Sequence, residues 1–150
     1  GSGVEQDDAE AVRWYRLAAE QGYAEAQQIL GWCYADGRGV EEDGAEAFRW
    51  CRLAAAQGNA PAQFLLGTSY ANGSGVEDGA EAVRWFRLAA AQGNALAQNR
   101  LGVCYANGSG VGQDEAEALR WYQLAAAQGD GEAEQAVARL SNTNEKKPRA

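Results

Sequence analysis

Histidine and methionine are absent from this 150-residue chain, and proline occurs only twice, at Pro61 and Pro148. Without histidine the chain has no Ser-His-Asp or Cys-His catalytic arrangement and no zinc-binding helix with paired histidines. No run of about 18 consecutive apolar residues is present, so the sequence predicts no membrane-spanning helix. We therefore expect no catalytic residue, no metal site and no cofactor, and we predict that the chain is not an enzyme.

Positive charge is also scarce, because 13 Lys and Arg residues stand against 21 Asp and Glu residues, which gives a net charge of -8. Nucleic-acid binding requires a surplus of Lys and Arg on one face, and anionic membrane surfaces attract the same residues. We therefore expect neither nucleic acid nor a membrane as a partner.

The three cysteines, Cys33, Cys51 and Cys104, are too few and too widely spaced for a disulfide framework or a structural zinc site. Buried free thiols are the simplest interpretation. A Cys33–Cys51 bridge between paired helices is the alternative, and the sequence leaves it open.

What the chain does have is a repeat of about 36 residues, a length typical of helical solenoids. Tryptophans recur at spacings of 36, 35 and 36 residues, at Trp14, Trp50, Trp85 and Trp121. A Gly-X-Gly-Val unit recurs with them, starting at Gly1, Gly37, Gly73 and Gly108. We expect one solenoid over residues 1–140, with a half unit at 1–23, complete units at 24–59, 60–94 and 95–130, a capping helix at 131–141 and a disordered polar tail at 142–150.

Each unit is predicted to contain two antiparallel helices joined by the Gly-X-Gly-Val loop. The second helices have suitable N-cap residues at Asp43, Asp78 and Asp114, and C-cap glycines at Gly58, Gly93 and Gly129. The first helices carry an apolar stripe (Ala26, Leu30 and Tyr34, with their copies) beside a mid-helix glycine at 31, 67 and 102. Glycine costs about 1 kcal/mol against alanine in a helix, so a close approach by the neighbouring helix is expected there. The predicted fold is an all-α solenoid of about four helix pairs.

These motifs resemble the SEL-one-like repeat (SLR) family, whose short units are relatives of the tetratricopeptide repeat. The chain supplies ALAQNRLGVCYANGSGV followed by DEAEALRWYQLAAAQG, and the match runs from residue 1 to about residue 140. The resemblance implies a right-handed α/α superhelix and an adaptor or scaffold for protein–protein interaction.

Two other functions remain open. A cysteine-rich bacterial branch of this family is associated with β-lactam binding or hydrolysis, and the resemblance implies that its cysteines pair across successive units. The matching positions here are Ala19 with Gln27, Ala55 with Gln63 and Ala90 with Gln98, which disfavours that branch. The second alternative is an engineered repeat array without a natural partner.

The candidate site residues are those that differ between units while the framework stays constant. They lie off the Leu–Tyr stripe of the first helices, which line the concave face of related solenoids, and aromatic residues beside arginine are typical of interaction hot spots. Packing against neighbouring helices is their alternative role. We predict a groove for a peptide or partner protein, formed by Gln28, Ile29, Trp32, Phe64, Leu65, Thr68, Asn99, Arg100 and Val103.

The chain opens in what is expected to be the loop before a second helix, so the partner first helix is missing. We therefore expect either a C-terminal piece of a longer solenoid or an array that self-associates through its open N-terminal end.

Overall fold

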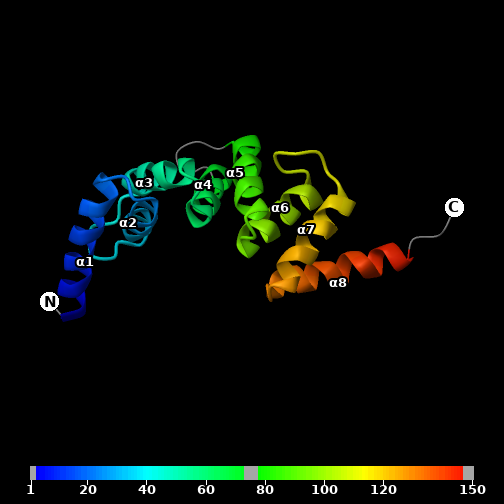
Figure 1. Ribbon diagram of the computed structural model, residues 1–150. Coiled ribbons are helices and arrows are strands. Elements are labelled where there is room, and N and C mark those ends of the chain that lie inside the picture. The colour runs from blue at the N-terminus through cyan, green and yellow to red at the C-terminus, as the bar shows by residue number, and fades with distance from the viewer. Residues whose placement is uncertain (1–2, 73–77, 147–150) are drawn as a thin grey trace. The chain divides into compact units, whose positions relative to one another are not determined.

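The computed structural model describes residues 3–72 and 78–146, with side chains up to residue 143 (Figure 1). Eight helices in four consecutive pairs lie in these ranges, and no strand is found among them. The expected all-α fold of four helix pairs is confirmed. The chain divides into two compact units, Gly1–Glu77 and Asp78–Ala150. The single solenoid over residues 1–140 stays a prediction.

Each unit contains four helices, and within it helices that follow one another in sequence pack side by side. The N-terminal unit contains α1 (Gly3–Glu20), α2 (Ala24–Asp36), α3 (Gly44–Ala56) and α4 (Ala60–Asn72). The C-terminal unit contains α5 (Gly79–Ala91), α6 (Ala95–Asn107), α7 (Glu115–Ala127) and α8 (Gly131–Lys146). The even-numbered helices are the first helices of the repeats, and the odd-numbered helices are the second.

The second helices begin and end as the sequence predicts. Asp43 Oδ1 accepts hydrogen bonds from the backbone N–H groups of Ala45 and Glu46 at 3.1 and 3.2 Å, and Asp78 and Asp114 cap α5 and α7 in the same way. The C-cap glycines have the left-handed φ angles of a Schellman motif, +94°, +92° and +94° at Gly58, Gly93 and Gly129.

Two boundaries differ from expectation. The first helix already begins at Gly3, so the first Gly-X-Gly-Val copy enters a helix instead of forming a loop. In the copies at 37–40 and 108–111 the first glycine is the left-handed C-cap of a first helix, whereas residues 1 and 2 of the first copy lie outside the described residues. At the other end α8 continues to Lys146, past the expected end at residue 141. Residues 142–146 contain neither glycine nor proline, so nothing in them stops the helix.

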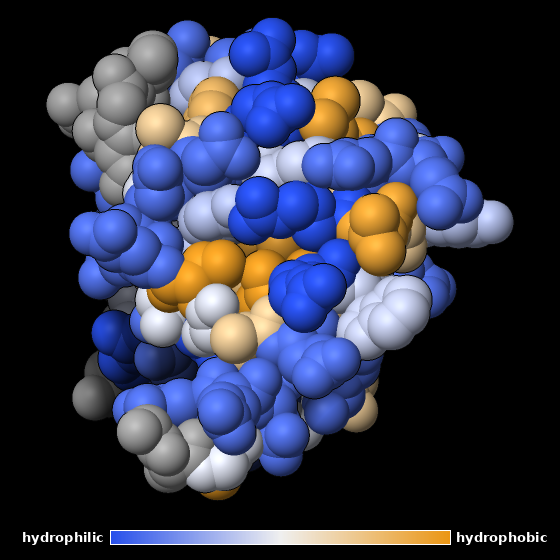
Figure 2. Space-filling view, turned by 90° about the vertical axis from the view of Figure 1, so that its left-hand side faces the viewer, coloured by the Kyte–Doolittle hydropathy of each residue, from blue (hydrophilic) through white to orange (hydrophobic). Residues whose placement is uncertain are grey.

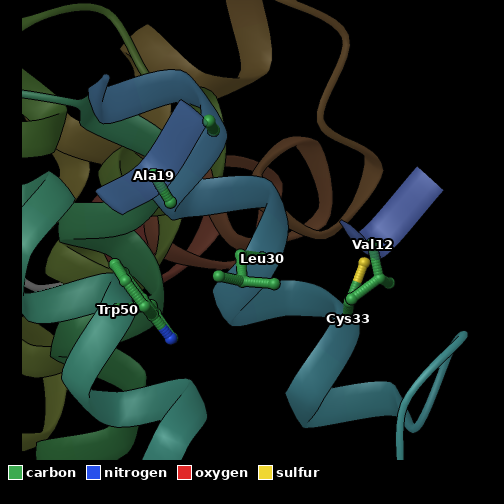
Figure 3. Packing of buried hydrophobic residues seen from close by; sticks show 6 residues of the cluster. Val12, Ala19, Leu30, Cys33 and Trp50 are labelled. Atoms are coloured by element: carbon green, nitrogen blue, oxygen red, sulfur yellow. The ribbon is translucent and has the colours of Figure 1, made fainter. Parts of the chain in front are cut away.

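The core of the N-terminal unit gathers buried side chains from three helices. Figure 3 shows Val12 and Ala19 of α1, Leu30 and Cys33 of α2, and Trp50 of α3 in this cluster. Leu30 is fully buried and Trp50 is 6% exposed, so Trp50 packs against the preceding repeat as expected.

The corresponding ring of α1, Trp14, is 66% exposed and lies outside this cluster. Trp14 is therefore an exposed aromatic residue near the N-terminal end of this unit. Self-association there stays a prediction.

The second glycine of the Gly-X-Gly-Val unit brings each loop onto the second helix of the preceding repeat. Gly39 has a φ of +76°, and a Cβ added to it would lie 2.4 Å from the carbonyl oxygen of Asp8 in α1. Gly110 has a φ of +75°, and its Cβ would lie 2.1 Å from the carbonyl oxygen of Gly79. Only glycine fits both the backbone angle and the contact. The motif therefore joins successive repeats as well as turning the chain. The copy at 73–76 lies outside the described residues.

Mid-helix glycines permit the close helix approach that the sequence predicts. A Cβ added to Gly102 would lie 2.8 Å from the ring of Tyr122, and a Cβ added to Gly31 would lie 2.7 Å from the Sγ of Cys51. In α2 and in α6 the first helix therefore rests directly on the residue that follows the repeat tryptophan in the second helix, Cys51 or Tyr122.

All three cysteines are buried free thiols, as the simpler interpretation expects. Burial raises the pKa of the Cys51 thiol to about 11. Cys51 is therefore protonated at neutral pH, and because the thiolate is the reactive form of cysteine, the thiol is unreactive.

A buried glutamine hydrogen bond joins successive repeats at the positions that the resemblance matches to the paired cysteines of the cysteine-rich branch. The Nε2 of Gln98 donates to the carbonyl oxygen of Ala90 at 3.2 Å, and Gln98 Oε1 accepts from the Nε2 of Gln128 at 2.9 Å. The bonds from Gln27 to Ala19 and from Gln63 to Ala55 repeat the first contact at 3.1 and 3.2 Å. These three glutamines are only 4–5% exposed, so their polar groups depend on these partners.

Cys51 leaves space where the other units carry an aromatic ring, at Tyr15, Phe86 and Tyr122. A cavity of about 300 Å³ lies beside it, lined also by Phe48 and Leu65. We expect Cys51→Phe to raise the free energy of unfolding by about 1 kcal/mol, because the added ring occupies this space and buries apolar surface. Urea denaturation measures the change, with Cys51→Ala as the matched control that enlarges the cavity. A Phe variant less stable than the wild type would show that the cavity does not admit a ring.

Candidate protein-binding site

The nine predicted site residues, which we call the variable positions, lie on three first helices. Those of α2 and α4 belong to the N-terminal unit: Gln28, Ile29, Trp32, Phe64, Leu65 and Thr68. Those of α6 belong to the C-terminal unit: Asn99, Arg100 and Val103. The two groups therefore lie in different compact units, and one groove running across both units stays a prediction.

Trp32 is the most accessible of the six positions in the N-terminal unit, with 46% of its surface exposed, whereas the other five are half-buried. The guanidinium of Arg38 lies over the Trp32 ring, 5.7 Å from its centroid, in a cation–π contact. Ile29 packs against the core cluster of α1–α3. Sequence reasoning did not include Arg38, although the loops offer the signal, since serine replaces it at position 109.

The variable positions of α4 open onto the cavity beside Cys51. Leu65 and Thr68 line it from α4, while Gly31 and Ala35 line it from α2. The Thr68 hydroxyl donates to the carbonyl oxygen of Phe64 at 3.0 Å, which satisfies its hydrogen-bonding capacity within the helix. This wall of the cavity therefore offers mainly apolar contact.

The surface on the α1 side of the molecule is mostly hydrophilic. Figure 2 shows the hydrophobic residues of this face in several small separate groups, one of them near its middle, with hydrophilic residues between them. Apolar contact area on this side is therefore local and does not form a broad patch.

In the C-terminal unit, two adjoining cavities of about 560 and 320 Å³ lie between α6, α7 and α8. Both are lined by Val103 of α6, Tyr122 of α7, and Ala136 and Arg139 of α8. The larger is lined also by Asn99, Glu132 and Gln135. We call these seven residues the α6–α8 groove.

Three of these groove residues lie in α8, at places equivalent to the variable positions of α6. The side chain of Asp130 accepts a hydrogen bond from the N–H of Ala133 at 2.9 Å, as Asn94 does from Ala97 at the start of α6. This shared cap fixes the register and equates Gln135, Ala136 and Arg139 with Asn99, Arg100 and Val103. Sequence reasoning missed them because α8 lacks the Leu-Gly and Tyr signatures, although Asp130 carries the register.

Asn99 is placed differently from the expectation for a partner-binding residue. It is 5% exposed, and its Nδ2 donates to the Oε2 of Glu132 at 3.0 Å, so α8 already covers it. Arg100 is exposed. Burial raises the pKa of Cys104, and the charge of Arg100 partly offsets this increase, which places the guanidinium near the thiol.

The outer face of three second helices, α3, α5 and α7, carries charge pairs between arginine and glutamate. Arg49, Arg84 and Arg120 pair with Glu46, Glu81 and Glu117 at 3.3, 3.3 and 2.6 Å. Such exposed pairs contribute only a few tenths of a kcal/mol each. This face is therefore solvated and makes a weak candidate for specific binding.

In the described ranges, no three His, Cys, Asp or Glu side chains are grouped so that they could hold a metal ion. None of the helices described there has the length and apolar character needed to cross a membrane.

The Sel1 repeat model matches residues 1–23, 24–59, 60–94 and 95–130. One similar solved structure is the protective antigen c5321 of uropathogenic Escherichia coli, which displays an SLR fold (45% identity, TM-score 0.81). The match covers 83% of this chain and 27% of that one. A Sel1 repeat protein from Oxalobacter formigenes has 35% identity and a TM-score of 0.82, with 88% and 54% covered. The chain thus spans about a quarter and about half of these relatives.

Cysteine-rich protein B of Helicobacter pylori is more distant, with 22% identity and a TM-score of 0.67. That match covers 89% of this chain and 97% of the other, and it shows a shared fold alone. Comparison with the curated proteins gave no match.

Proposed function

Because the chain belongs to the Sel1 repeat family, whose members are generally non-catalytic interaction scaffolds, we propose that it binds a peptide or partner protein through its first helices. The observation that carries this proposal is the contrast between framework and variable positions. Leu30, Leu66 and Leu101 of the framework are at most 1% exposed. Leu65 lines the cavity of the N-terminal unit, and Val103 lines both cavities of the α6–α8 groove.

Trp32 is the strongest single anchor for a partner. Tryptophan and arginine are enriched among interface hot spots, and Arg38 already lies over the Trp32 ring. The ring is held in place but remains 46% exposed, so a partner gains apolar contact without first having to order the side chain.

We expect Trp32→Ala combined with Phe64→Ala to lower affinity for bound peptides by about tenfold or more, because an aromatic hot spot contributes about 2 kcal/mol. Peptides selected on the wild-type chain from a random-peptide library provide the probes, and fluorescence anisotropy measures their affinity. Helical content by circular dichroism should not change, since neither side chain is fully buried.

Trp14→Ala is the matched control, because Trp14 is exposed but lies outside the variable positions. Unchanged peptide affinity in the double variant would place the site elsewhere. Affinity capture from the source cell, followed by mass spectrometry, then identifies the natural partner. The two alternative functions, β-lactam binding or hydrolysis and an engineered array, stay predictions that no observation on the described residues favours.

A further inference from the structure

Arg139 is one of the described arginines whose charge is not taken up by an ion pair or a side-chain hydrogen bond. Among the described contacts, Arg49, Arg84 and Arg120 form ion pairs, and Arg16 and Arg87 donate to the hydroxyl groups of Tyr34 and Tyr105. In the same described part of the chain, the Arg139 side chain makes no ion pair or hydrogen bond. It lines both cavities of the α6–α8 groove.

Tyr122 contributes an unused hydroxyl to the same groove. The residue is 5% exposed, and its ring rests on Gly102. Its hydroxyl has no hydrogen-bond partner in the described residues, although Tyr122 lines both cavities. Phe86 occupies the equivalent position and is also buried, so the ring alone completes the core and the hydroxyl is an addition.

Charge couples these two groups. Burial raises the pKa of Tyr122, the nearby Arg139 guanidinium partly offsets the increase, and Cys104 and the Glu132 carboxylate add to it. The hydroxyl therefore remains protonated at neutral pH and can donate a hydrogen bond beside a positive charge. Glu132 also lines the groove, but its Oε2 already accepts the hydrogen bond from Asn99 at 3.0 Å.

We propose that the α6–α8 groove receives the carboxylate of an aspartate or glutamate side chain of the partner peptide. The Arg139 guanidinium and the Tyr122 hydroxyl supply two donors and one positive charge, which suit a singly charged acceptor. Val103 and Ala136 provide apolar contact for the methylene groups of that side chain. The inference rests on the proposed function and names the chemistry that the partner must present.

The test uses peptides selected on the full chain from a random-peptide library and then synthesised with an amidated C-terminus. Each is paired with a version in which Asp or Glu becomes Asn or Gln. The wild-type chain should bind the acidic version about tenfold more tightly, since a hydrogen bond between charged groups is stronger than a neutral one. Arg139→Gln and Tyr122→Phe should each reduce this preference, and the double variant should abolish it.

The controls separate the groove from general charge effects. Arg120→Gln removes the same charge from the outer face of α7 and should leave the preference unchanged. Tyr122→Phe removes only the hydroxyl and keeps the ring that Phe86 shows to be compatible with the core.

Two outcomes would overturn the proposal. One is equal binding of acidic and amide peptides. The other is displacement of the peptide by inorganic phosphate but not by acetate at equal ionic strength. Peptides that depend on Trp32 and Phe64 but ignore Arg139 would refute this inference while supporting the proposed function. Failure to select any peptide would refute both.

Discussion

Gly110→Ala is expected to lower the free energy of unfolding by about 3 kcal/mol, because it combines backbone strain with a clash between a loop and the start of a helix. Alanine disfavours the φ of +75° at this position. Its Cβ would also lie 2.1 Å from the carbonyl oxygen of Gly79, a backbone atom that cannot turn aside like a side chain. Relief requires the loop after α6 to move away from the start of α5. Urea denaturation followed by circular dichroism measures the loss.

Gly129→Ala separates the two causes. Gly129 has a φ of +94°, but no heavy atom lies within 4 Å of its added Cβ. This variant keeps the strain without the clash and should lose about 1–2 kcal/mol. Equal losses in the two variants would mean that the loop relaxes freely, so the Gly-X-Gly-Val unit would then act only as a turn.

Local signals made most of the fold predictable from the sequence. Helix capping depends only on residues next to one another in the sequence. Asp43, for example, caps α3 by accepting a hydrogen bond at its Oδ1. A glycine inside a helix is unfavourable, so its recurrence in every repeat indicates a contact that offsets the cost. At Gly102 the ring of Tyr122 makes that contact. These inferences need only neighbouring residues and the repeat period.

The site was less predictable because its contacts join residues that the repeat pattern does not relate. Asn99 looked accessible from its variability, yet Glu132, 33 residues later, covers it with a hydrogen bond. Arg139 could not be assigned because α8 has lost the framework residues that mark the register. The exposure of Trp32 follows from its helix position, whereas the cation–π contact with Arg38 depends on how the loop folds back.

At the glutamine contact, two positions that the resemblance matches to paired cysteines are joined by a hydrogen bond instead. The resemblance located the pair Ala90 and Gln98, but only the structure shows a buried amide donating to a backbone carbonyl at 3.2 Å. Gln98 also accepts from Gln128, so one side chain serves as both donor and acceptor. A hydrogen bond here joins successive repeats without requiring an oxidising environment.

Gln98→Glu should therefore convert this contact into a pH-dependent defect. Gln98 is 4% exposed, so an ionised carboxylate there is poorly solvated and faces the Ala90 carbonyl oxygen, which repels it. Both effects raise the pKa of the new Glu in the folded state above its value of about 4.3 in the unfolded chain. Between those two pKa values the folded state binds more protons, so the stability of the variant relative to wild type falls as pH rises through that interval.

At pH 7 the Gln98→Glu variant is expected to be about 3 kcal/mol less stable than the wild type, whereas below pH 4 most of the loss disappears. The protonated carboxyl can then donate to Ala90 as the amide does. Urea denaturation of both chains across this pH range measures the difference. Gln98→Leu is the matched control, because it loses both hydrogen bonds without adding a charge and should show a deficit that does not vary with pH. If the Glu variant instead showed the same pH-independent loss of stability, its carboxylate would be reaching water. The contact between Gln98 and Ala90 would then not exclude solvent, as the burial of Gln98 indicates that it does.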